Sequence, residues 1–245
     1  MIKHLGEKAQ FLTWQLICSC FTTLDIPAEW KIAHLYPIPK PTDWECNIEK
    51  TRPITLLETI RKAFVKILNV RLSHIMTQHQ VLKGNNYAGL PGSSTEDPIK
   101  IINLLLEDAK TKKQKIWILL QDLSKAYDRV SLKILKLALQ HVKIPTSCIQ
   151  LILNLFTKRK NRVFTADGLT DEYEVQIGID QGEVISPLLW CIYFDPLLCE
   201  IDNLKKGYTI QHTWRPNVNS THTTTLSEMV SSLGYMNDAN WISTS

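Results

Sequence analysis

Two aspartates, Asp122 and Asp238, are the residues whose surroundings best suit metal-dependent chemistry. Each lies where an apolar run that predicts a strand gives way to residues that favour a turn. A carboxylate in that place is exposed at a rigid strand edge and offers the oxygen ligands that Mg²⁺ prefers. Two of them on neighbouring strands would bridge two ions and stabilise both sides of a phosphoryl transfer. Taken alone the pair is a weak signal, because aspartate near a strand end more often makes turn contacts.

The elements that must carry these residues follow from the periodicity of the apolar positions. Helices are predicted over 9–24, 57–75, 97–109, 131–142 and 146–156, and from Ser186 onward. Strand signals cover 30–41, 116–120 and 173–177, and 233–242 predicts a strand, a two-residue turn and a second strand. This mixture predicts an α+β fold.

Four details of these elements are open to direct test. The prolines that close the first strand-like run are expected to fix an extended path, stop strand pairing and leave Lys40 on an exposed turn. The continuous apolar run 116–120 predicts a buried strand that leads into Asp122. Asn237-Asp238 is expected to form the turn of the last strand pair, whereas the polar stretch 207–232 predicts an irregular connection.

The composition excludes several classes of protein. The chain has 245 residues, of which 44% are hydrophobic and 21% charged, and this excludes a disordered or fibrous protein. Six cysteines without a CxxC pair argue against a zinc site or a disulfide scaffold and favour an intracellular protein, in nucleus or cytoplasm and not secreted. No run approaches the ~18 apolar residues of a membrane span, so no membrane partner is expected.

The charge pattern is less informative. A net charge of +4 does not by itself identify a nucleic-acid binder. Two basic runs, 110–115 and 158–162, would attract a phosphate backbone in a salt-dependent way. Solvated loops of like charge explain both runs almost equally well.

Five blocks of sequence, in order, resemble the reverse transcriptase domain of non-LTR (LINE-type) retrotransposons. They are Ile38-Pro39-Lys40-Pro41, Arg52-Pro53-Ile54-Thr55-Leu56-Leu57, Asp122 to Arg129, Gly178 to Leu189, and Tyr235-Met236-Asn237-Asp238. The loop 89–95 is similar to the family's segment between fingers and palm. Each block alone is a modest signal, but their order and spacing extend the resemblance over about 14–242.

The resemblance implies a metal centre and a nucleotide pocket. Asp122 matches the first palm aspartate, a metal ligand, and Leu123 would offer a backbone carbonyl beside it. Tyr127 matches the aromatic residue under the sugar of the incoming nucleotide, where a ring excludes a 2′-hydroxyl by its bulk. Gln181 and Gly182 match the block that lines the nucleotide pocket; glycine permits close backbone approach, and glutamine offers a donor and an acceptor.

Lys40 and Arg52 match the fingers residues that grip the triphosphate. An arginine fork and a lysine point charge are both suited to phosphate oxygens. Outside this context, solvated surface charges would be the better explanation of the two residues.

The last block departs from the family pattern of two consecutive aspartates, because Asn237 stands at the position of the first. An amide oxygen can still coordinate Mg²⁺, but the negative charge is gone. Losing a preorganised electrostatic element of this kind costs on the order of 10²–10³ in rate. The expected catalytic set is therefore Asp122, Asn237 and Asp238, with two Mg²⁺ ions bound more weakly through the two carboxylates. Two smaller departures, Asp180 and Glu183, would add negative charge near the nucleotide pocket.

The expected architecture is a right-hand polymerase with fingers over 1–115 and a palm over 116–245, built on a small antiparallel sheet backed by helices. The chain ends at Ser245, just past the predicted hairpin, so the thumb is expected to be absent. The strand ending at Asp122 should lie beside the hairpin, with the two carboxylates about 4–8 Å apart, as a two-metal site requires.

The expected function is that of an RNA-directed DNA polymerase domain that adds deoxynucleoside triphosphates to a primer on an RNA or DNA template, with activity impaired in this chain. The alternative is a non-catalytic nucleic-acid-binding relic of the same fold. A maturase-type protein that binds intron RNA is a third reading, which the absence of a basic C-terminal extension opposes.

Overall fold

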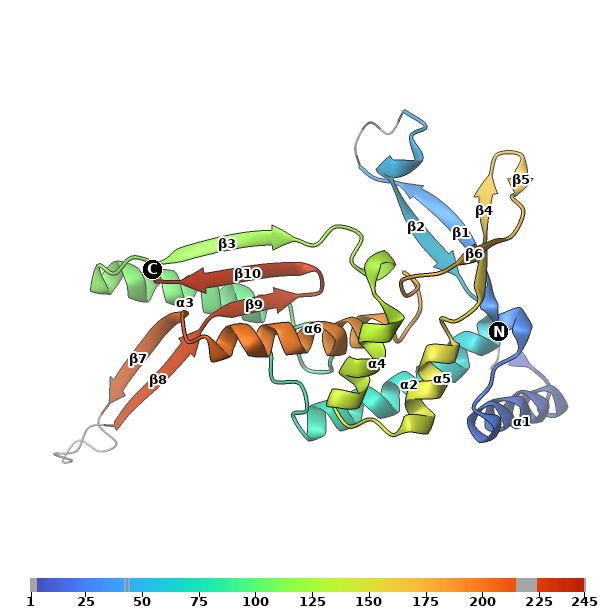
Figure 1. Cartoon of the computed structure of the whole chain (residues 1–245), viewed down its shortest axis with the longest axis horizontal. Helices are drawn as coiled ribbons and strands as arrows, with labels where there is room; N and C mark the ends of the chain where they lie inside the picture. Colours follow the sequence, from blue (N-terminus) through green and yellow to red (C-terminus); the bar gives the residue numbers. More distant parts are fainter. Residues whose placement is uncertain (1–3, 42, 44, 215–223, 245) are drawn as a thin grey trace. The chain divides into compact units, whose positions relative to one another are not determined.

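The computed structural model describes residues 4–41, 43, 45–214 and 224–244 and contains both helices and sheets, in agreement with the mixed fold expected from the sequence (Figure 1). It divides into two compact units. The first unit combines Met1–Leu72 with Lys125–Leu189, and the second combines Ser73–Ser124 with Trp190–Ser245. Each unit therefore combines two separate stretches of the chain. The division into fingers (1–115) and palm (116–245) follows the subdomains of the family instead, and it stays a prediction.

The first unit is built on one sheet. Its strands are β1 (Ile32–Pro39), β2 (Thr51–Leu56), β4 (Arg159–Thr165), β5 (Gly168–Leu169) and β6 (Tyr173–Val175). The order is β2-β1-β4-β5, and β6 also pairs with β4. The pair β1–β2 is antiparallel and β1–β4 is parallel. The sheet thus places β1, which ends just before Lys40, between β2, which carries Arg52, and β4, whose residues 160–162 pair with 32–34.

All six predicted helices are present. They are α1 (Glu7–Thr23), α2 (Thr59–Gln78), α3 (Glu96–Lys112), α4 (Leu132–His141), α5 (Thr146–Asn154) and α6 (Ser186–Asn203). The described residues also form three short 3₁₀ turns: η2 (Ala28–Lys31) between α1 and β1, η3 (Ile48–Lys50) between β1 and β2, and η4 (Tyr127–Arg129) between β3 and α4. Ser131 begins α4 as its N-cap, because its hydroxyl accepts the Ile134 N–H. None of the helices in the described part of the chain is long and apolar enough to cross a membrane.

The prolines of β1 do not stop strand pairing, contrary to the prediction. β1 pairs with β2 from His34 to Pro39, with Pro37 opposite Pro53 and Pro39 opposite Thr51. The Lys40 N–H donates to the Lys50 carbonyl at 2.9 Å, so the hydrogen-bonded pairs of this ladder fall on the even-numbered β1 positions. Both prolines occupy the alternate positions, where a nitrogen points away from β2 and no ladder bond is lost.

The second unit contains a three-stranded antiparallel sheet in the order β3-β10-β9. Its strands are β3 (Trp117–Asp122), β9 (Ser232–Tyr235) and β10 (Asp238–Ser243). The prediction that the strand ending at Asp122 lies beside the C-terminal hairpin is confirmed. The predicted turn is wrong by one position, because Met236-Asn237 forms it and Asp238 is already the first residue of β10.

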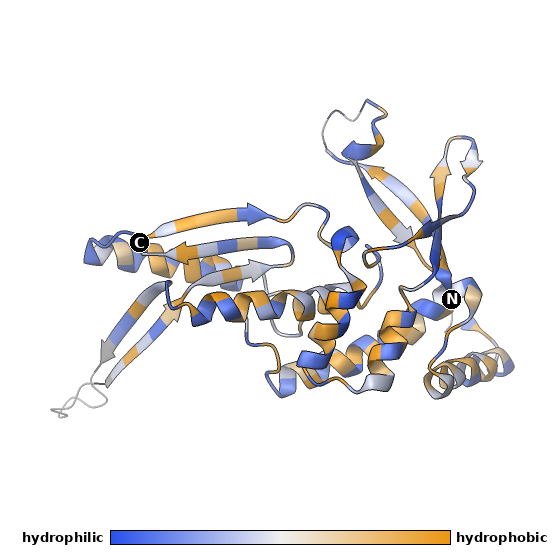
Figure 2. Cartoon of the chain, viewed as in Figure 1, coloured by the Kyte–Doolittle hydropathy of each residue, from blue (hydrophilic) through white to orange (hydrophobic). Residues whose placement is uncertain are grey.

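Two further predictions for the second unit are wrong. Within 207–232 the described residues are mainly two paired strands, β7 (Tyr208–Trp214) and β8 (Thr224–Val230), while 215–223 lie outside the described residues. Threonine is polar but β-branched, so it supports a strand as readily as a loop. β3 is a strand, but it is not buried: Leu119 is 63% and Leu120 76% exposed. Figure 2 shows this apolar strand, which pairs with β10 alone among the described residues.

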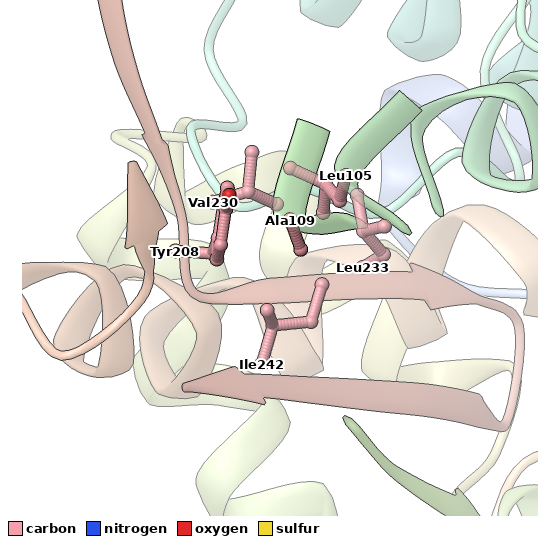
Figure 3. Close-up of a cluster of buried hydrophobic side chains, with 6 residues drawn as sticks. All are labelled: Leu105, Ala109, Tyr208, Val230, Leu233 and Ile242. Carbon is pink, nitrogen blue, oxygen red and sulfur yellow. The ribbon is translucent and has the colours of Figure 1, made fainter. Parts of the chain in front are cut away.

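The core of the second unit joins α3 to both of its sheets. Leu105 and Ala109 of α3 pack with Leu233 of β9 and Ile242 of β10 (Figure 3). Tyr208 and Val230 of the β7–β8 hairpin complete the cluster. This packing holds the two strands that carry the candidate metal ligands, because Ile242 of β10 belongs to the cluster and Ile118 of β3 packs against it.

We expect Leu105→Ala to lower the free energy of unfolding by about 2–5 kcal/mol, because it leaves a cavity in this cluster. Leu105 is 1% exposed, and its neighbour Leu104, at 56%, provides the matched control. Leu104→Ala should change stability by about 0.5 kcal/mol or less. Urea unfolding followed by circular dichroism measures both, and equal losses would contradict the placement of α3.

Candidate functional site

Asp122 and Asp238 are paired across the sheet of the second unit. The register sets Asp238 opposite Asp122, and the Leu123 N–H donates to the Asn237 carbonyl at 3.0 Å. Position 123 is therefore hydrogen-bonded, and the aspartate pair is a non-hydrogen-bonded one. Side chains of such a pair point to one face of the sheet, with Cβ atoms about 4.5–5.5 Å apart. The register thus supports the carboxylate proximity expected from the sequence; the distance itself stays a prediction.

Asn237 contacts the first of these carboxylates. Its Nδ2 donates to Asp122 Oδ1 at 2.7 Å, in an exposed position. An aspartate in its place could not donate, and its charge would repel Asp122. The amide therefore satisfies one oxygen that the metal-site prediction assigns to a cation.

The turn that bears Asn237 is held from two sides. Trp190, at the start of the second-unit part of α6, donates its Nε1–H to the Met236 carbonyl at 2.6 Å. Asn85 accepts the Gly234 N–H at 2.7 Å, and Tyr87 donates to the Gly234 carbonyl at 2.9 Å. Sequence reasoning missed the roles of Trp190 and of the segment Asn85–Tyr87, since no motif links them to the turn.

The donor set of the second unit fits a hard cation only in part. Asp122 and Asp238 supply carboxylate oxygens, the ligand chemistry of Mg²⁺. Over the residues that the structure describes, there is no group of three or more His, Cys, Asp and Glu side chains that could hold a metal ion. Asn237 could add an amide oxygen without charge. Asp122, Asn237 and Asp238 therefore offer the oxygen ligands of a Mg²⁺ site. Their total charge is lower than that of three carboxylates, because the Asn237 amide is neutral.

The residues matched to the nucleotide pocket lie in the first unit and are joined by backbone bonds. Ile179 donates its N–H to the Tyr127 carbonyl, and Thr55 of β2 donates to the Gln181 carbonyl, both at 2.9 Å. Gly182 has φ +124°, and a Cβ there would lie 2.7 Å from the Thr55 carbonyl oxygen. Glycine is therefore required for this approach. Tyr127, Gln181 and Gly182 are thus anchored to one another and to β2.

Arg52 and Lys40 lie farther along the same hairpin, and both are exposed. Arg52 is in β2, three positions from Thr55, and Lys40 follows the last residue of β1. At a rise of about 3.3 Å per residue, Lys40 lies about 16 Å along the hairpin from the level of Thr55. The first unit therefore brings Arg52 closer than Lys40 to the anchored loop. Leu123, by contrast, lies in the second unit with Asp122.

Asp180 and Glu183 do not add net charge to the pocket, which corrects the expectation from the sequence. Asp180 pairs with Arg159 and, at 3.3 Å, with Arg61, while Glu183 pairs with Arg61 at 2.9 Å. All four side chains are at most 4% exposed, and their charges balance. The two arginines lie in α2 and β4, far from Asp180 and Glu183 in the sequence. The local sequence around these carboxylates therefore does not predict the pairing.

The basic run 158–162 is a strand and not a basic loop. Arg159 and Asn161 are buried on one face of β4, which alternates as strands do. Lys160 pairs with Glu172 at 3.0 Å, and Arg162 donates its Nε–H to the Thr170 carbonyl at 2.8 Å. The run therefore does not form a continuous cationic surface.

A family model described as "Reverse transcriptase (RNA-dependent DNA polymerase)" matches residues 38–235. A probable RNA-directed DNA polymerase from transposon X-element of Drosophila melanogaster is 28% identical over 167 residues, which are 68% of this chain and 18% of that protein. A retrovirus-related Pol polyprotein from type-1 retrotransposable element R2 of Popillia japonica is 27% identical over 73% of this chain and 24% of its own length. The chain thus spans about a fifth of these relatives.

Solved telomerase structures share the fold. Telomerase from Candida albicans, in complex with a fragment of telomeric RNA, matches 96% of this chain and 42% of its own, at 13% identity and a TM-score of 0.57. Apo telomerase from Candida tropicalis, truncated from its C-terminal domain, matches 95% of this chain and 49% of its own, at 12% identity and a TM-score of 0.57. At such identities the likeness shows the fold alone.

The buried cluster predicts a pH dependence of stability. Burial raises the pKa of the Glu183 carboxyl above its ordinary 4.5, although Arg61 opposes the shift and Asp180 adds to it. The folded state therefore holds this proton more tightly than the unfolded chain, and the contribution of Glu183 to stability falls as pH rises from 4.5 through the raised pKa.

We expect this decline to disappear in Glu183→Gln and to persist in Glu174→Gln, which changes an exposed glutamate on β6. Urea unfolding between about pH 4 and pH 8 measures it, since that window spans the carboxyl range. If the stability of the unmodified chain relative to Glu183→Gln rose with pH instead, the ion pair with Arg61 would outweigh burial.

Proposed function

The chain belongs to the reverse transcriptase (RNA-dependent DNA polymerase) family, and on this premise we propose that it serves in a retrotransposon RNA-directed DNA polymerase. The observation that carries the proposal is the pairing of Asp122 with Asp238 on neighbouring strands. Residues 1–115 would be the fingers and 116–245 the palm of a right-hand polymerase. The reaction adds deoxynucleoside triphosphates to a primer on an RNA or DNA template, inside the cell, in nucleus or cytoplasm.

Asp122 and Asp238 would hold Mg²⁺ through their carboxylate oxygens. When bound, Mg²⁺ neutralises the triphosphate and favours ionisation of the primer hydroxyl. A cation that takes the place of the Asn237 amide at Asp122 Oδ1 displaces that hydrogen bond. Hydrogen bonds to charged groups contribute about 1.5–3 kcal/mol, so this exchange weakens metal binding. Impaired activity follows from the competition as well as from the missing charge.

The first unit would bind the nucleotide and position it. Arg52 and Lys40 would contact phosphate oxygens, as a fork and as a point charge. Tyr127 would lie under the sugar, and Gln181 and Gly182 would line the pocket. Leu123 of the second unit would offer its carbonyl, because its N–H is already bonded to Asn237.

An exposed face of the first unit's sheet supports a nucleic-acid partner. We name it the aromatic face, formed by His34, Tyr36, Phe164, Arg52 and Arg162. Cross-strand pairs share a face, and the register pairs His34 with Arg162 and Ile38 with Arg52. The Phe164 ring lies 5.5 Å from that of His34 and 6.0 Å from that of Tyr36, which is 51% exposed. Exposed rings beside cations suit stacking on unpaired bases.

The alternative function is a nucleic-acid-binding protein without catalysis. The hydrogen bond between Asn237 and Asp122 favours it, because the pair is satisfied without a cation. The aromatic face would serve that function equally well. The two proposals therefore differ only in what the second unit does.

Restoring the missing charge decides between them. Asn237→Asp should raise Mg²⁺-dependent incorporation of labelled deoxynucleotide on a primed RNA template by on the order of 10²–10³. The control is Gln121→Glu, which adds one charge next to Asp122 on the other face of β3 and keeps the acceptor for the Trp241 Nε1–H. Equal incorporation by all three chains would show that the amide suffices; no incorporation with retained RNA binding would support the alternative.

Tyr36→Ala should weaken binding of a fluorescein-labelled single-stranded RNA, measured by anisotropy at fixed salt. Loss of one stacking side chain costs about 1–3 kcal/mol per base. Tyr173→Ala is the matched control, because this tyrosine is 44% exposed and its partner in the register is Asn161, on the opposite face. Equal affinities for both variants would exclude the aromatic face as the binding surface.

A further inference from the structure

Arg159 contacts the segment 177–183, which contains Asp180 and carries the two residues matched to the nucleotide pocket. We propose that Arg159 and Asp180 are positioning residues that fix the Gln181 side chain for nucleotide binding. The inference rests on the proposed function, and it adds Arg159, which lies in none of the five sequence blocks. Its parts all lie in the first unit.

Arg159 fixes the start of this segment through three acceptors. Its guanidinium NH2 donates to the carbonyls of Ile177 at 2.9 Å and Gly178 at 2.7 Å. Its other terminal nitrogen donates to the Asp180 carboxylate. A planar fork that reaches three acceptors around one bend leaves the backbone little freedom.

Asp180 joins the segment to the rest of the unit. Its second oxygen accepts from Arg61, whose own NH1 and NH2 also donate to the carbonyls of Trp30 and Leu155. Its backbone carbonyl accepts the Ser186 hydroxyl at 2.8 Å at the start of α6. The residue just before Gln181 is therefore held by side chain and by main chain at once.

Gln181 is the residue of this fixed segment that follows Asp180 and lines a cavity. Its own carbonyl is bonded to Thr55, and Gly182 abuts the same residue. Gln181 lines a cavity of about 370 Å³ whose wall also includes Pro53 and Asp128. With the backbone fixed on both sides, the orientation of this side chain is set by Arg159 and Asp180.

The burial of the charges argues for positioning over stability. Arg159 and Asp180 are each 3% exposed. A buried ion pair contributes little net stability compared with apolar residues of the same shape, while it restricts geometry. A segment that needed only to be stable could use an apolar contact here. A segment that must present one amide in one orientation gains from directional bonds.

The test is a double-mutant cycle on nucleotide affinity. Arg159→Lys keeps the charge beside Asp180 and removes the fork, and the probe is N-methylanthraniloyl-dTTP with Mg²⁺, followed by fluorescence. We expect the dissociation constant to rise about tenfold in the unmodified background and less than about twofold in the Gln181→Ala background. Arg71→Lys, at an exposed position of α2, is the control and should change neither value. Equal fold changes in both backgrounds would overturn the proposal.

A second measurement needs no nucleotide. The side-chain amide signal of Gln181 in a ¹⁵N–¹H correlation spectrum is assigned by its loss in Gln181→Ala. Arg159→Lys should shift or broaden that signal, while Arg71→Lys leaves it in place; an unchanged signal would overturn the proposal. If the amide responds but no chain binds the labelled triphosphate, the proposed function fails and the positioning stands.

Discussion

The register between β3 and β10 is the constraint on which the candidate site depends. A slip of one residue would carry Asp238 to the other face of the sheet and separate it from Asp122. Two contacts outside the ladder oppose such a slip: the Trp190 indole on the Met236 carbonyl, and the bonds from the segment at Asn85 to Gly234. The pair is thus placed by packing around the hairpin and by Asn237 of the turn, which accepts the Leu123 N–H and donates to Asp122 Oδ1.

Charges in the two units behave differently because their surroundings differ. Asp122 and Asp238 are exposed, so water solvates them and a cation remains able to bind. Asp180 and Glu183 are buried, and unpaired charges there would be costly. Arg61 and Arg159 neutralise these two carboxylates, so Asp180 and Glu183 add no net negative charge at the pocket. Their remaining effect is structural, because their hydrogen bonds orient the backbone of this segment.

Local signals account for most of what the sequence could predict. The helices follow from apolar spacing and from caps such as Ser131, and the adjacency of Asp122 to the hairpin follows from the family blocks. The errors share one cause, which is that a local pattern does not say what lies across from it. The run at Leu119 and Leu120 looks buried, yet both leucines, which lie on opposite faces of β3, are exposed, and the Arg61 pairings span more than a hundred positions.

The separation into units bears on how such a protein loses function. The change to asparagine at 237 acts through Asp122, and both residues lie in the second unit. The anchored segment around Gln181, the buried charges and the aromatic face all lie in the first unit and keep their own supports. Because each set of residues is supported within its own unit, a loss of metal binding in the second need not disturb the first. Catalysis can therefore be lost while nucleic-acid binding persists, which makes a binding protein the natural descendant of an enzyme built in this way.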